Sequence, residues 1–431
     1  MPFVRQPSRI AKAVLYTLLI AAPTLHAAPS GEITVWAWDI AADALRKVTP
    51  AFNKQYPGVK VVVKELSTDQ VYEQALAACA AKGQGLADVV MLENSAAEKY
   101  WKQFPQCFAT LERFGVQQLN KDFPAFKWAE LQAGGHTYAL PWDSGPVAVF
   151  YRRDLYQQAG IDASKIETWD DFKAAGLKLS KATNGQVKMA MSNHLTGDSW
   201  FSMLANQNRC SYFTQSGNDI RITINQPTCV KAMSKLKDLV SSGIIGTGDW
   251  DGRLQALKAN KAASAVDGAW YEGSIRDTMP EQSGKWGVYL MPAFNKGGLR
   301  AANNGGSALA ISGTSKSQDA AWAFVKFALA TKDSQGIFLK NGLVPSYLPA
   351  LHSPDVEAAQ PYWGGQKIWP TILATQQHIV SVRSTPFMSA ASQVVVKVQN
   401  DFLQGKYPDA QQALDEAAKQ IAQSTGLKIG S

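Results

Sequence analysis

The sequence predicts an α/β fold in which a parallel β-sheet is covered by helices on both faces. Between residues 31 and 95, apolar strand-type stretches alternate with stretches of helical spacing, an order typical of parallel sheets. With 431 residues, the chain is too long for one ordinary core and long enough for two domains or one large α/β unit. Its 46% hydrophobic and 18% charged residues are typical of a globular protein.

The N-terminal segment, residues 1–27, is predicted to be a signal peptide and not part of the fold. Three basic residues precede the short apolar run AVLYTLLIAAPTL, which leads into the small residues of HAAPSGE. A membrane anchor is the alternative, but the run is too short to span about 30 Å of hydrocarbon and contains Pro23. We therefore expect cleavage after Ala27 and a mature protein that is soluble outside the cytoplasm.

The first strand is EITVWAW, and a helix with Leu45, Val48 and Phe52 at helical spacing follows it. VKVVVKEL is the second strand, DQVYEQALAACAAKG the second helix and ADVVML the third strand. The ends of the first and third strands carry Trp38, Asp39, Glu93, Asn94 and Ser95. Because ligands collect beyond the carboxyl ends of parallel strands, these five residues are candidate ligand contacts.

The stretch HTYALPWDSGPVAVFYRRDL contains two predicted strands, TYAL and VAVFY, separated by a cluster of chain breakers. That cluster places an indole, Trp142, and a carboxylate, Asp143, where the chain leaves one strand for the next. The following helix TWDDFKAAGLKL begins with Thr168 as N-cap and Asp171 three residues later, an acidic variant of the capping box. GQVKMAMS is a further strand, and DAAWAFVKFALA and DAQQALDEAAKQIAQS are later helices.

The four cysteines indicate disulfides in an oxidising compartment: Cys79, Cys107, Cys210 and Cys229. The sequence-local pairs Cys79–Cys107 and Cys210–Cys229 are the natural pairing, although other connectivities remain open at this point. Without the signal peptide, 40 basic and 35 acidic residues remain, scattered along the chain. A nucleic-acid-binding protein would cluster its basic residues, so we expect no nucleic-acid partner.

The sequence contains no motif of a metal site, a nucleophile elbow or a phosphate-binding loop, so we expect no cofactor and no metal. Acids beside aromatic residues are common, and a glycosidase would need two of them about 5 Å or 6.5–9.5 Å apart. The same composition suits sugar binding without chemistry, because indole faces cover pyranose rings and short polar side chains pair with hydroxyls.

The tryptophans fall into two groups. Trp38, Trp142 and Trp270 stand beside polar or Gly-rich breaks and are candidates for stacking on a ligand. Those in ordinary helix or strand patterns are expected to be structural: Trp128, Trp169, Trp286 and Trp322.

Several stretches occur in the order typical of one family: FNKQYPGVKVVV, ADVVMLENS, YALPWDSGPVAVFYRRDLYQQAGI with ETWDDF, DGAWYEGS, GGSALAIS, AAWAFVKFAL and NGLVPSY. From about Gly31 to its last helix, the chain resembles the family 1 extracellular solute-binding proteins of ABC importers, relatives of the maltose-binding protein. The resemblance implies a two-lobed, type II-like periplasmic-binding-protein fold. Each lobe would be a mainly parallel sheet flanked by helices, with several hinge crossings between the lobes.

The resemblance also implies a division of the chain. Residues 28–142 and 304–345 would form the N-terminal lobe, and residues 143–303 and 346–431 the C-terminal lobe. LPWDSGPV, NNGGSALAIS and LVPSY would be the crossings that line or support the ligand cleft.

Carried over to this chain, the resemblance implies these ligand-binding residues: Trp38, Asp39, Glu93, Asn94, Ser95, Trp142, Asp143, Asp198, Trp250, Asp251, Trp270, Glu272, Asn304, Gly305 and Gly306. Further candidates are Asn193, Trp200, Asn303, Ser307, Trp363 and Phe387.

The function that the resemblance implies is capture of a mono- or oligosaccharide by hinge closure and delivery to the membrane subunits of an ABC permease. The protein would act as a monomer and would not be an enzyme. The alternatives are the same fold carrying a polyamine or glycerol 3-phosphate, or a secreted carbohydrate-active enzyme. A phosphate ligand would favour an Arg cluster at the cleft positions, and the sequence has none there.

Overall fold

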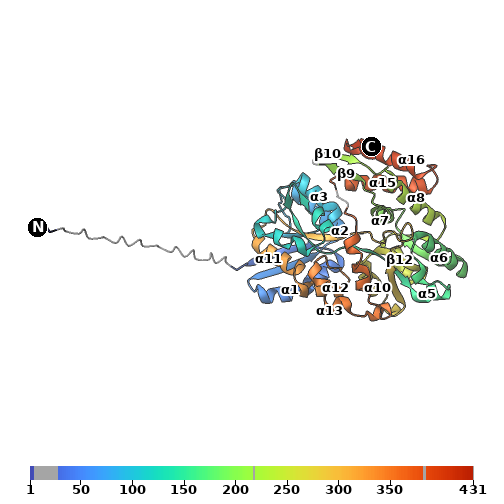
Figure 1. The fold of residues 1–431 in the computed structure, drawn as a ribbon, viewed down its shortest axis with the longest axis horizontal. Helices are drawn as coiled ribbons and strands as arrows, with labels where there is room; N and C mark the ends of the chain where they lie inside the picture. The colour runs from blue at the N-terminus through green and yellow to red at the C-terminus, as the bar shows by residue number, and fades with distance from the viewer. Residues whose placement is uncertain (4–27, 217–218, 382–384, 431) are drawn as a thin grey trace.

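The computed structural model describes residues 1–3, 28–216, 219–381 and 385–430. The predicted signal peptide lies, from residue 4 to residue 27, outside the described residues. From residue 28 onward, the described chain forms two α/β lobes that lie side by side (Figure 1). In the described part of the chain, no helix combines the length and the apolar character needed to cross a bilayer.

The first lobe is built on a five-stranded sheet of order β2-β1-β3-β14-β6. Its strands are β1 (Gly31–Ala37), β2 (Val59–Glu65), β3 (Val89–Glu93), β6 (Ala139–Pro141) and β14 (Ser307–Ile311). β1 pairs in parallel with β2 and β3, so Val35 lies opposite Val63 on one side and Val89 on the other. β14 is antiparallel to both β3 and β6, so four of the five strands run in the same direction.

The second lobe repeats this plan with a sheet of order β11-β8-β12-β7-β13. Its strands are β7 (Val147–Arg152), β8 (Lys188–Ser192), β11 (Ile245–Thr247), β12 (Ala262–Gly268) and β13 (Trp286–Leu290). β8 pairs in parallel with β11 and β12, and β7 is antiparallel to both β12 and β13. The predicted architecture of two mainly parallel sheets is therefore confirmed.

The reversed strand of each sheet is the one that the chain enters from the other lobe. β7 follows β6 of the first lobe, and β14 follows β13 of the second. A strand that starts at the junction runs away from it, whereas β1, β3, β8 and β12 end there. The reversal therefore places the carboxyl ends of both parallel sets at the junction between the lobes, where ligand sites of open α/β sheets lie.

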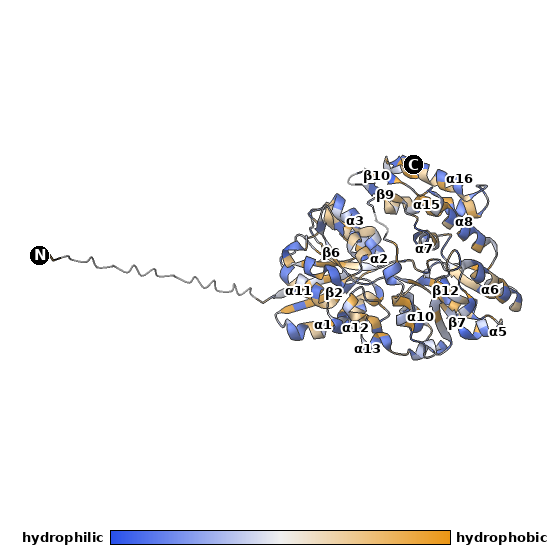
Figure 2. Cartoon of the chain, in the orientation of Figure 1, coloured by the Kyte–Doolittle hydropathy of each residue, from blue (hydrophilic) through white to orange (hydrophobic). Residues whose placement is uncertain are grey.

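Helices cover both faces of each sheet. The α-helices of the first lobe are α1 (Asp39–Gln55), α2 (Thr68–Ala80), α3 (Asn94–Gln103), α4 (Ala125–Glu130), α11 (Gln318–Leu329) and α12 (Lys332–Lys340). The remaining α-helices of the described chain are α5 (Arg153–Gln158), α6 (Trp169–Ala182), α7 (Ser199–Gln207), α8 (Pro227–Ser241), α9 (Trp250–Lys258), α10 (Tyr271–Thr278), α13 (Pro354–Glu357), α14 (Ile368–Leu373), α15 (Met388–Leu403) and α16 (Ala410–Thr425). Figure 2 shows hydrophilic and hydrophobic residues on each of the long surface helices, as amphipathic packing requires.

Short elements complete the fold. A small sheet of order β15-β10-β9 contains β9 (Phe213–Ser216), β10 (Asp219–Ile222) and β15 (Lys428–Ile429), and β4 (Gln132–Ala133) pairs with β5 (His136–Thr137). The 3-10 helices are Glu112–Phe114, Val116–Asp122, Ala163–Lys165, Pro280–Gln282, Leu348–Ala350, Pro361–Trp363 and Gln376–His378.

Each sheet is buried on both faces. In β7, Val147 and Val149 face one hydrophobic cluster of the second lobe, and Ala148 and Phe150 face another. This alternation follows from the two-residue period of a strand. Thr168 and Asp171 form the predicted capping box at the start of α6.

The structure joins the cysteines as the two predicted sequence-local pairs. Cys79 is bonded to Cys107 and Cys210 to Cys229. The first bond ties the end of α2 to the segment after α3, and the second ties the end of α7 to the start of α8.

Candidate functional site

Within the described residues, three segments connect the lobes: residues 142–146, 301–306 and 343–346. The first lies between the other two, because Ser144 N–H donates to Val344 O at 3.1 Å and Asn304 N–H donates to Gly145 O at 2.8 Å. The chain breakers in these stretches therefore form a compact three-stranded junction that both lobes share.

Glycine is required at this junction by close backbone approach. A Cβ on Gly145 would lie 1.8 Å from the carbonyl oxygen of Asn304, a distance that no side chain tolerates. Gly306 has a φ of +101°, and a Cβ there would lie 2.7 Å from Lys127 Nζ. These two positions explain the Gly residues in the first and second crossings.

A cavity of about 530 Å³ lies between the lobes, beside the second crossing. The start of α3 and the end of α4 form its wall in the first lobe, and α7, the segment after it and the start of α15 form the opposite wall. Its lining is rich in hydroxyls, amides and acids, including Glu93, Asn94, Ser95, Glu130, Asp198, Ser199, Ser202, Asn206, Tyr212, Asn303, Asn304, Gly305, Ser389, Ser392 and Gln393.

A buried polar network forms the wall of the first lobe. Lys127 is fully buried, and its Nζ donates to Asn94 Oδ1 at 2.8 Å. Asn94 Nδ2 in turn donates to Glu130 Oε2 at 2.7 Å. Desolvation raises the pKa of Glu130 to about 7, although Lys127 and the Asn94 bond oppose this shift. Desolvation also lowers the pKa of Lys127 and raises that of Glu93.

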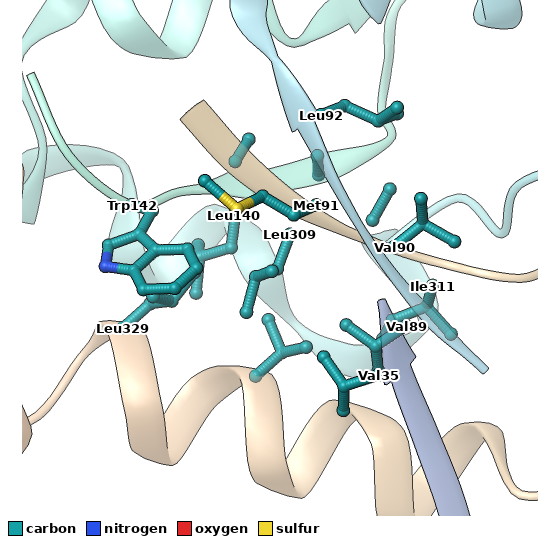
Figure 3. Packing of buried hydrophobic residues seen from close by; sticks show 14 of the residues in the cluster. Val35, Val89, Val90, Met91, Leu92, Leu140, Trp142, Leu309, Ile311 and Leu329 are labelled. Carbon is teal, nitrogen blue, oxygen red and sulfur yellow. The ribbon is translucent and has the colours of Figure 1, made fainter. Parts of the chain in front are cut away.

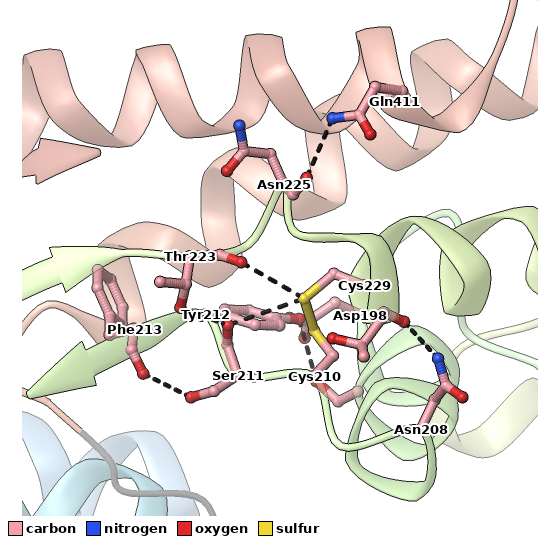
Figure 4. The surroundings of a disulfide bond; sticks show 12 residues. Asp198, Asn208, Cys210, Ser211, Tyr212, Phe213, Thr223, Asn225, Cys229 and Gln411 are labelled. Carbon is pink, nitrogen blue, oxygen red and sulfur yellow. Dashed lines mark hydrogen bonds between the residues drawn. A yellow bond between two sulfur atoms is a disulfide. The ribbon is translucent and has the colours of Figure 1, made fainter. Parts of the chain in front are cut away.

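The opposite wall is organised around Asp198. Tyr212 Oη donates to Asp198 Oδ2 at 2.7 Å, and burial raises the pKa of Asp198 despite this bond and one with Ser392. Figure 4 shows Asp198 and Tyr212 beside the Cys210–Cys229 bond. Cys210 itself lines the cavity, so this disulfide fixes part of the wall.

A pair of stacked indoles, one exposed and one partly buried, lies near the cavity. Trp250 is 43% exposed and stacks on Trp270 with ring centroids 5.6 Å apart. Trp270 Nε1 donates at 2.8 Å to the carbonyl oxygen of Asn304, which is a cavity residue. Arg253 lies 5.6 Å from the centroid of the Trp250 ring and pairs with Asp267. Asn304, in the second crossing, therefore both lines the cavity and holds the indole of Trp270.

The structure brings six of the predicted ligand-binding residues to the cavity: Glu93, Asn94, Ser95, Asp198, Asn304 and Gly305. The others lie outside its lining: Trp38, Asp39, Trp142, Asp143, Trp250, Asp251, Trp270, Glu272 and Gly306.

Trp142, expected at the floor of the cleft, lies in the core of the first lobe. It is 1% exposed and its ring centroid is 5.0 Å from that of Phe338. Figure 3 shows Trp142 among the buried hydrophobic residues of this core. Trp38 is also largely buried and lies 6.0 Å from Tyr72, centroid to centroid. Both indoles stand at strand ends, where the sequence alone does not show which way a side chain points.

Two of the predicted acids are held by internal partners. Asp143 Oδ1 accepts hydrogen bonds from Ser307 N and Oγ at 2.8 and 2.5 Å, which joins the first crossing to β14. Glu272 accepts from Trp363 Nε1 at 2.9 Å and pairs with Arg276 at 3.0 Å. Both carboxylates are buried and act within the fold.

Other predicted residues lie on the surface or in the core. Asp39 is exposed at the end of β1 with a φ of +46°, a conformation uncommon for a non-glycine residue. Desolvation, with a contribution from Glu65, raises its pKa. Asp251 is exposed in the first turn of α9. Among the further candidates, Trp200 and Trp363 are buried, Asn193 and Phe387 are half-buried and Asn303 lines the cavity.

Sequence reasoning missed Glu130, Tyr212 and the residues of α15. They stand in ordinary helices or beside a cysteine, and no cluster of breakers marks them. A second cavity of about 680 Å³, with walls that include Phe123, Phe126 and Leu373, contains none of the predicted residues. Within the described ranges, no group of three or more His, Cys, Asp or Glu residues could hold a metal ion.

Similarity to known proteins extends over most of the chain. A family model for bacterial extracellular solute-binding proteins matches residues 38–335. A lactose-binding protein of Rhizobium radiobacter is 28% identical over 84% of this chain and 86% of its own length. An arabinooligosaccharide-binding protein of Bacillus subtilis strain 168 is 26% identical over 95% of this chain and 97% of its own length.

Among solved structures, the ABC-transporter-associated binding protein of B. animalis subsp. lactis Bl-04, in complex with β-1,6-galactobiose, has a TM-score of 0.78 to this chain. It is 25% identical, and the alignment covers 93% of this chain and all of that one. The two-lobed arrangement is thus shared with a protein that holds a saccharide.

Proposed function

Because the chain belongs to the family of bacterial extracellular solute-binding proteins, we propose that it binds a mono- or oligosaccharide and passes it to the permease of an ABC importer. The observation that carries this proposal is the cavity between the lobes, which is lined by hydroxyls and amides and lies near the exposed indole of Trp250 and its partner Trp270. Sugar hydroxyls need such partners when they leave water, and a flat ring covers the apolar face of a pyranose.

Hinge closure is the mechanism that this geometry favours. The cavity takes residues from both lobes and from the second crossing, so a ligand bound there touches both lobes at once. Contacts made only in the closed form shift the population toward closure. We propose that the corresponding lobes are residues 28–142 with 304–345 and residues 143–303 with 346–431. The membership of the two five-stranded sheets supports this division as far as residue 311.

The remaining parts of the proposal concern location and partners. We infer that residues 1–27 direct export to the periplasm and that the mature protein works as a monomer with the transmembrane subunits of the permease. We also infer that no bond of the ligand is made or broken. The acids Asp143 and Glu272 support this inference, because internal partners hold both.

A thermal-shift screen of neutral mono- and oligosaccharides, spermidine and glycerol 3-phosphate tests the function. A saccharide at about 100 times its Kd should raise the free energy of unfolding by about 2.7 kcal/mol. Calorimetric titration of the best ligand should show one site per chain, and chromatography after prolonged incubation should recover it unchanged. Stabilisation by spermidine or glycerol 3-phosphate alone would contradict the sugar assignment, and released products would indicate an enzyme.

Substitution at the indole pair tests the site. Trp250→Ala should weaken saccharide binding at least tenfold without loss of folding, because the side chain is 43% exposed and contributes little to the core. Leu177→Ala removes a side chain of similar exposure, 47%, from α6 and serves as the control. Equal affinities of the two variants would place the ligand elsewhere.

A further inference from the structure

The cavity between the lobes has a one-sided charge. Three carboxylates line it, those of Glu93, Glu130 and Asp198, and no Lys, Arg or His belongs to its described lining. The cavity is a candidate ligand site independently of these acids, because uncharged hydroxyl and amide groups of both lobes form most of its polar surface. The acids therefore bear on which ligand enters it.

The lysine coupled to these acids does not reach the cavity. Lys127 is fully buried, donates to Asn94 Oδ1 and faces the charges of Glu130, Asp143 and Glu93. One positive charge thus stands against three carboxylates on this side of the cavity, and Asp198 adds a fourth on the other side.

Hydrogen bonds hold the lining acids in place but do not neutralise them. Glu130 accepts from the uncharged Asn94, and Asp198 accepts from the uncharged Tyr212. Burial raises the pKa of Glu93, Glu130 and Asp198 alike, because desolvation penalises the charged form of each carboxyl group. A ligand that brings positive charge into the cavity would supply what these side chains lack.

The distribution of the acids over the lobes couples this charge to closure. Glu93 and Glu130 belong to the first lobe, and Asp198 belongs to the second. Closure brings like charges nearer and removes water from between them, so their repulsion grows. A cationic group held between the lobes turns this repulsion into attraction, whereas an anionic group increases it.

We propose that the cavity selects its saccharide by charge: it favours a sugar bearing a protonated amino group and excludes sugars bearing a carboxylate or phosphate. This inference rests on the proposed function and names the ligand class within it. The ammonium pairs with the carboxylates of the two walls, and the hydroxyls and amides of the lining receive the rest of the sugar.

Calorimetric titration with a matched set of saccharides at pH 7.5 tests the proposal, because Glu130, with a pKa of about 7, is then mostly ionised, while an amino group with a pKa of about 8 is still mostly protonated. With lactose as parent, the set is lactose, lactosamine, N-acetyllactosamine and lactobionate; another parent from the screen takes the corresponding derivatives. The amino sugar should bind at least tenfold more tightly than its N-acetyl form and the parent. The acid should bind at least tenfold more weakly than the parent.

Variants of the lining acids test whether the ratio of the affinities for the amino and N-acetyl sugars depends on the cavity. Glu130→Gln and Asp198→Asn keep an acceptor for Asn94 and Tyr212, and each should narrow the ratio between amino and N-acetyl sugar at least threefold. Glu281→Gln removes an exposed acid of the second lobe and should leave the ratio unchanged. Circular dichroism and the melting point verify that each variant is folded.

The outcomes separate the two proposals. If saccharides bind but the amino and N-acetyl forms bind equally, or the acid binds as well as the parent, the charge selection is overturned and the sugar carrier stands. If the ratio of the affinities for the amino and N-acetyl sugars is unchanged in both cavity variants, the selectivity comes from another site and this inference is wrong. If no saccharide binds and spermidine does, the proposed function fails as well.

Discussion

At the scale of single residues, the junction depends on polar groups that a core normally excludes. Lys127 is fully buried, yet it donates to Asn94 and faces three carboxylates. A buried charge persists only where partners compensate it. Here the compensation also fixes Asn94 at the cavity wall, so one network serves both the fold and the site.

Glu130 gives the stability a pH dependence of known sign. Its folded-state pKa of about 7 lies above the ordinary value of 4.5, so between these values the folded state holds a proton that the unfolded state releases. This contribution to stability is complete below pH 4.5 and is lost as the pH rises to about 7, with a slope of at most about 1.4 kcal/mol per pH unit.

The variant Glu130→Gln should remove this contribution. Urea unfolding at pH 5, 6 and 7 should show the variant gaining stability relative to the parent as the pH rises, because Gln does not titrate. Glu93 and Asp198 shift in the same direction and titrate in both proteins, so the difference between the two proteins isolates residue 130. Parallel curves would show that Glu130 has an ordinary pKa.

At the scale of elements, the three crossings act as one unit. The first crossing bonds to the second and to the third through its backbone, and Asp143 links it to β14. Backbone segments approach this closely only where side chains are absent, which explains Gly145 between Trp142 and β7.

Gly145→Ala should therefore destabilise the protein by about 1–3 kcal/mol or more, since the new Cβ would lie 1.8 Å from Asn304 O. Urea unfolding followed by circular dichroism measures the loss. In the control, Gly336→Ala on α12, the nearest atom is an oxygen of the partly exposed Asp355 side chain at 3.3 Å, and helix propensity favours alanine. A harmless Gly145→Ala would mean that the crossings are loosely packed.

The two disulfides should differ in their effect on function. Replacing either pair by alanine should cost about 2–5 kcal/mol of unfolding free energy, because loops of 28 and 19 residues lose their closure. Only loss of Cys210–Cys229 should also weaken saccharide binding, since Cys210 lines the cavity and Tyr212 follows it. Calorimetric titration measures the saccharide affinity of both double variants. Equal affinities would show that the Cys210–Cys229 bond does not determine the shape of the cavity wall.

At the scale of the whole molecule, two similar sheets meet at their carboxyl ends around a shared junction. The first lobe has one main hydrophobic core, and the second has one on each face of its sheet. We therefore expect each lobe to move as one body and relative motion to occur at the crossings. This arrangement suits a protein that must hold a ligand and release it.

Ligand binding should therefore make the molecule more compact without changing its secondary structure. Small-angle scattering with saturating saccharide should show a smaller radius of gyration, while far-ultraviolet circular dichroism stays constant. Trp250→Ala at the same ligand concentration should show a smaller change, because fewer molecules are occupied. An unchanged radius with full occupancy would indicate binding without closure.

The sequence by itself determined the order of strands and helices, the capping box at Thr168 and the polar strand ends at Glu93–Ser95. It favoured the two sequence-local cysteine pairs, and the structure selected them among the possible connectivities. These features depend on local spacing, on turn chemistry or on short loops, and therefore on residues that are close together in the sequence. The order of the motifs also indicated the family.

Only the tertiary structure decided which side chains face the cavity. Trp142 and Glu93 both stand at strand ends, yet the first packs on Phe338 and the second lines the cavity. Glu130 and Tyr212 reach the same cavity from segments about 80 residues apart in sequence, with no local signal. The direction of a side chain at a strand end depends on contacts with distant segments, and those contacts exist only once both sheets and the crossings have assembled.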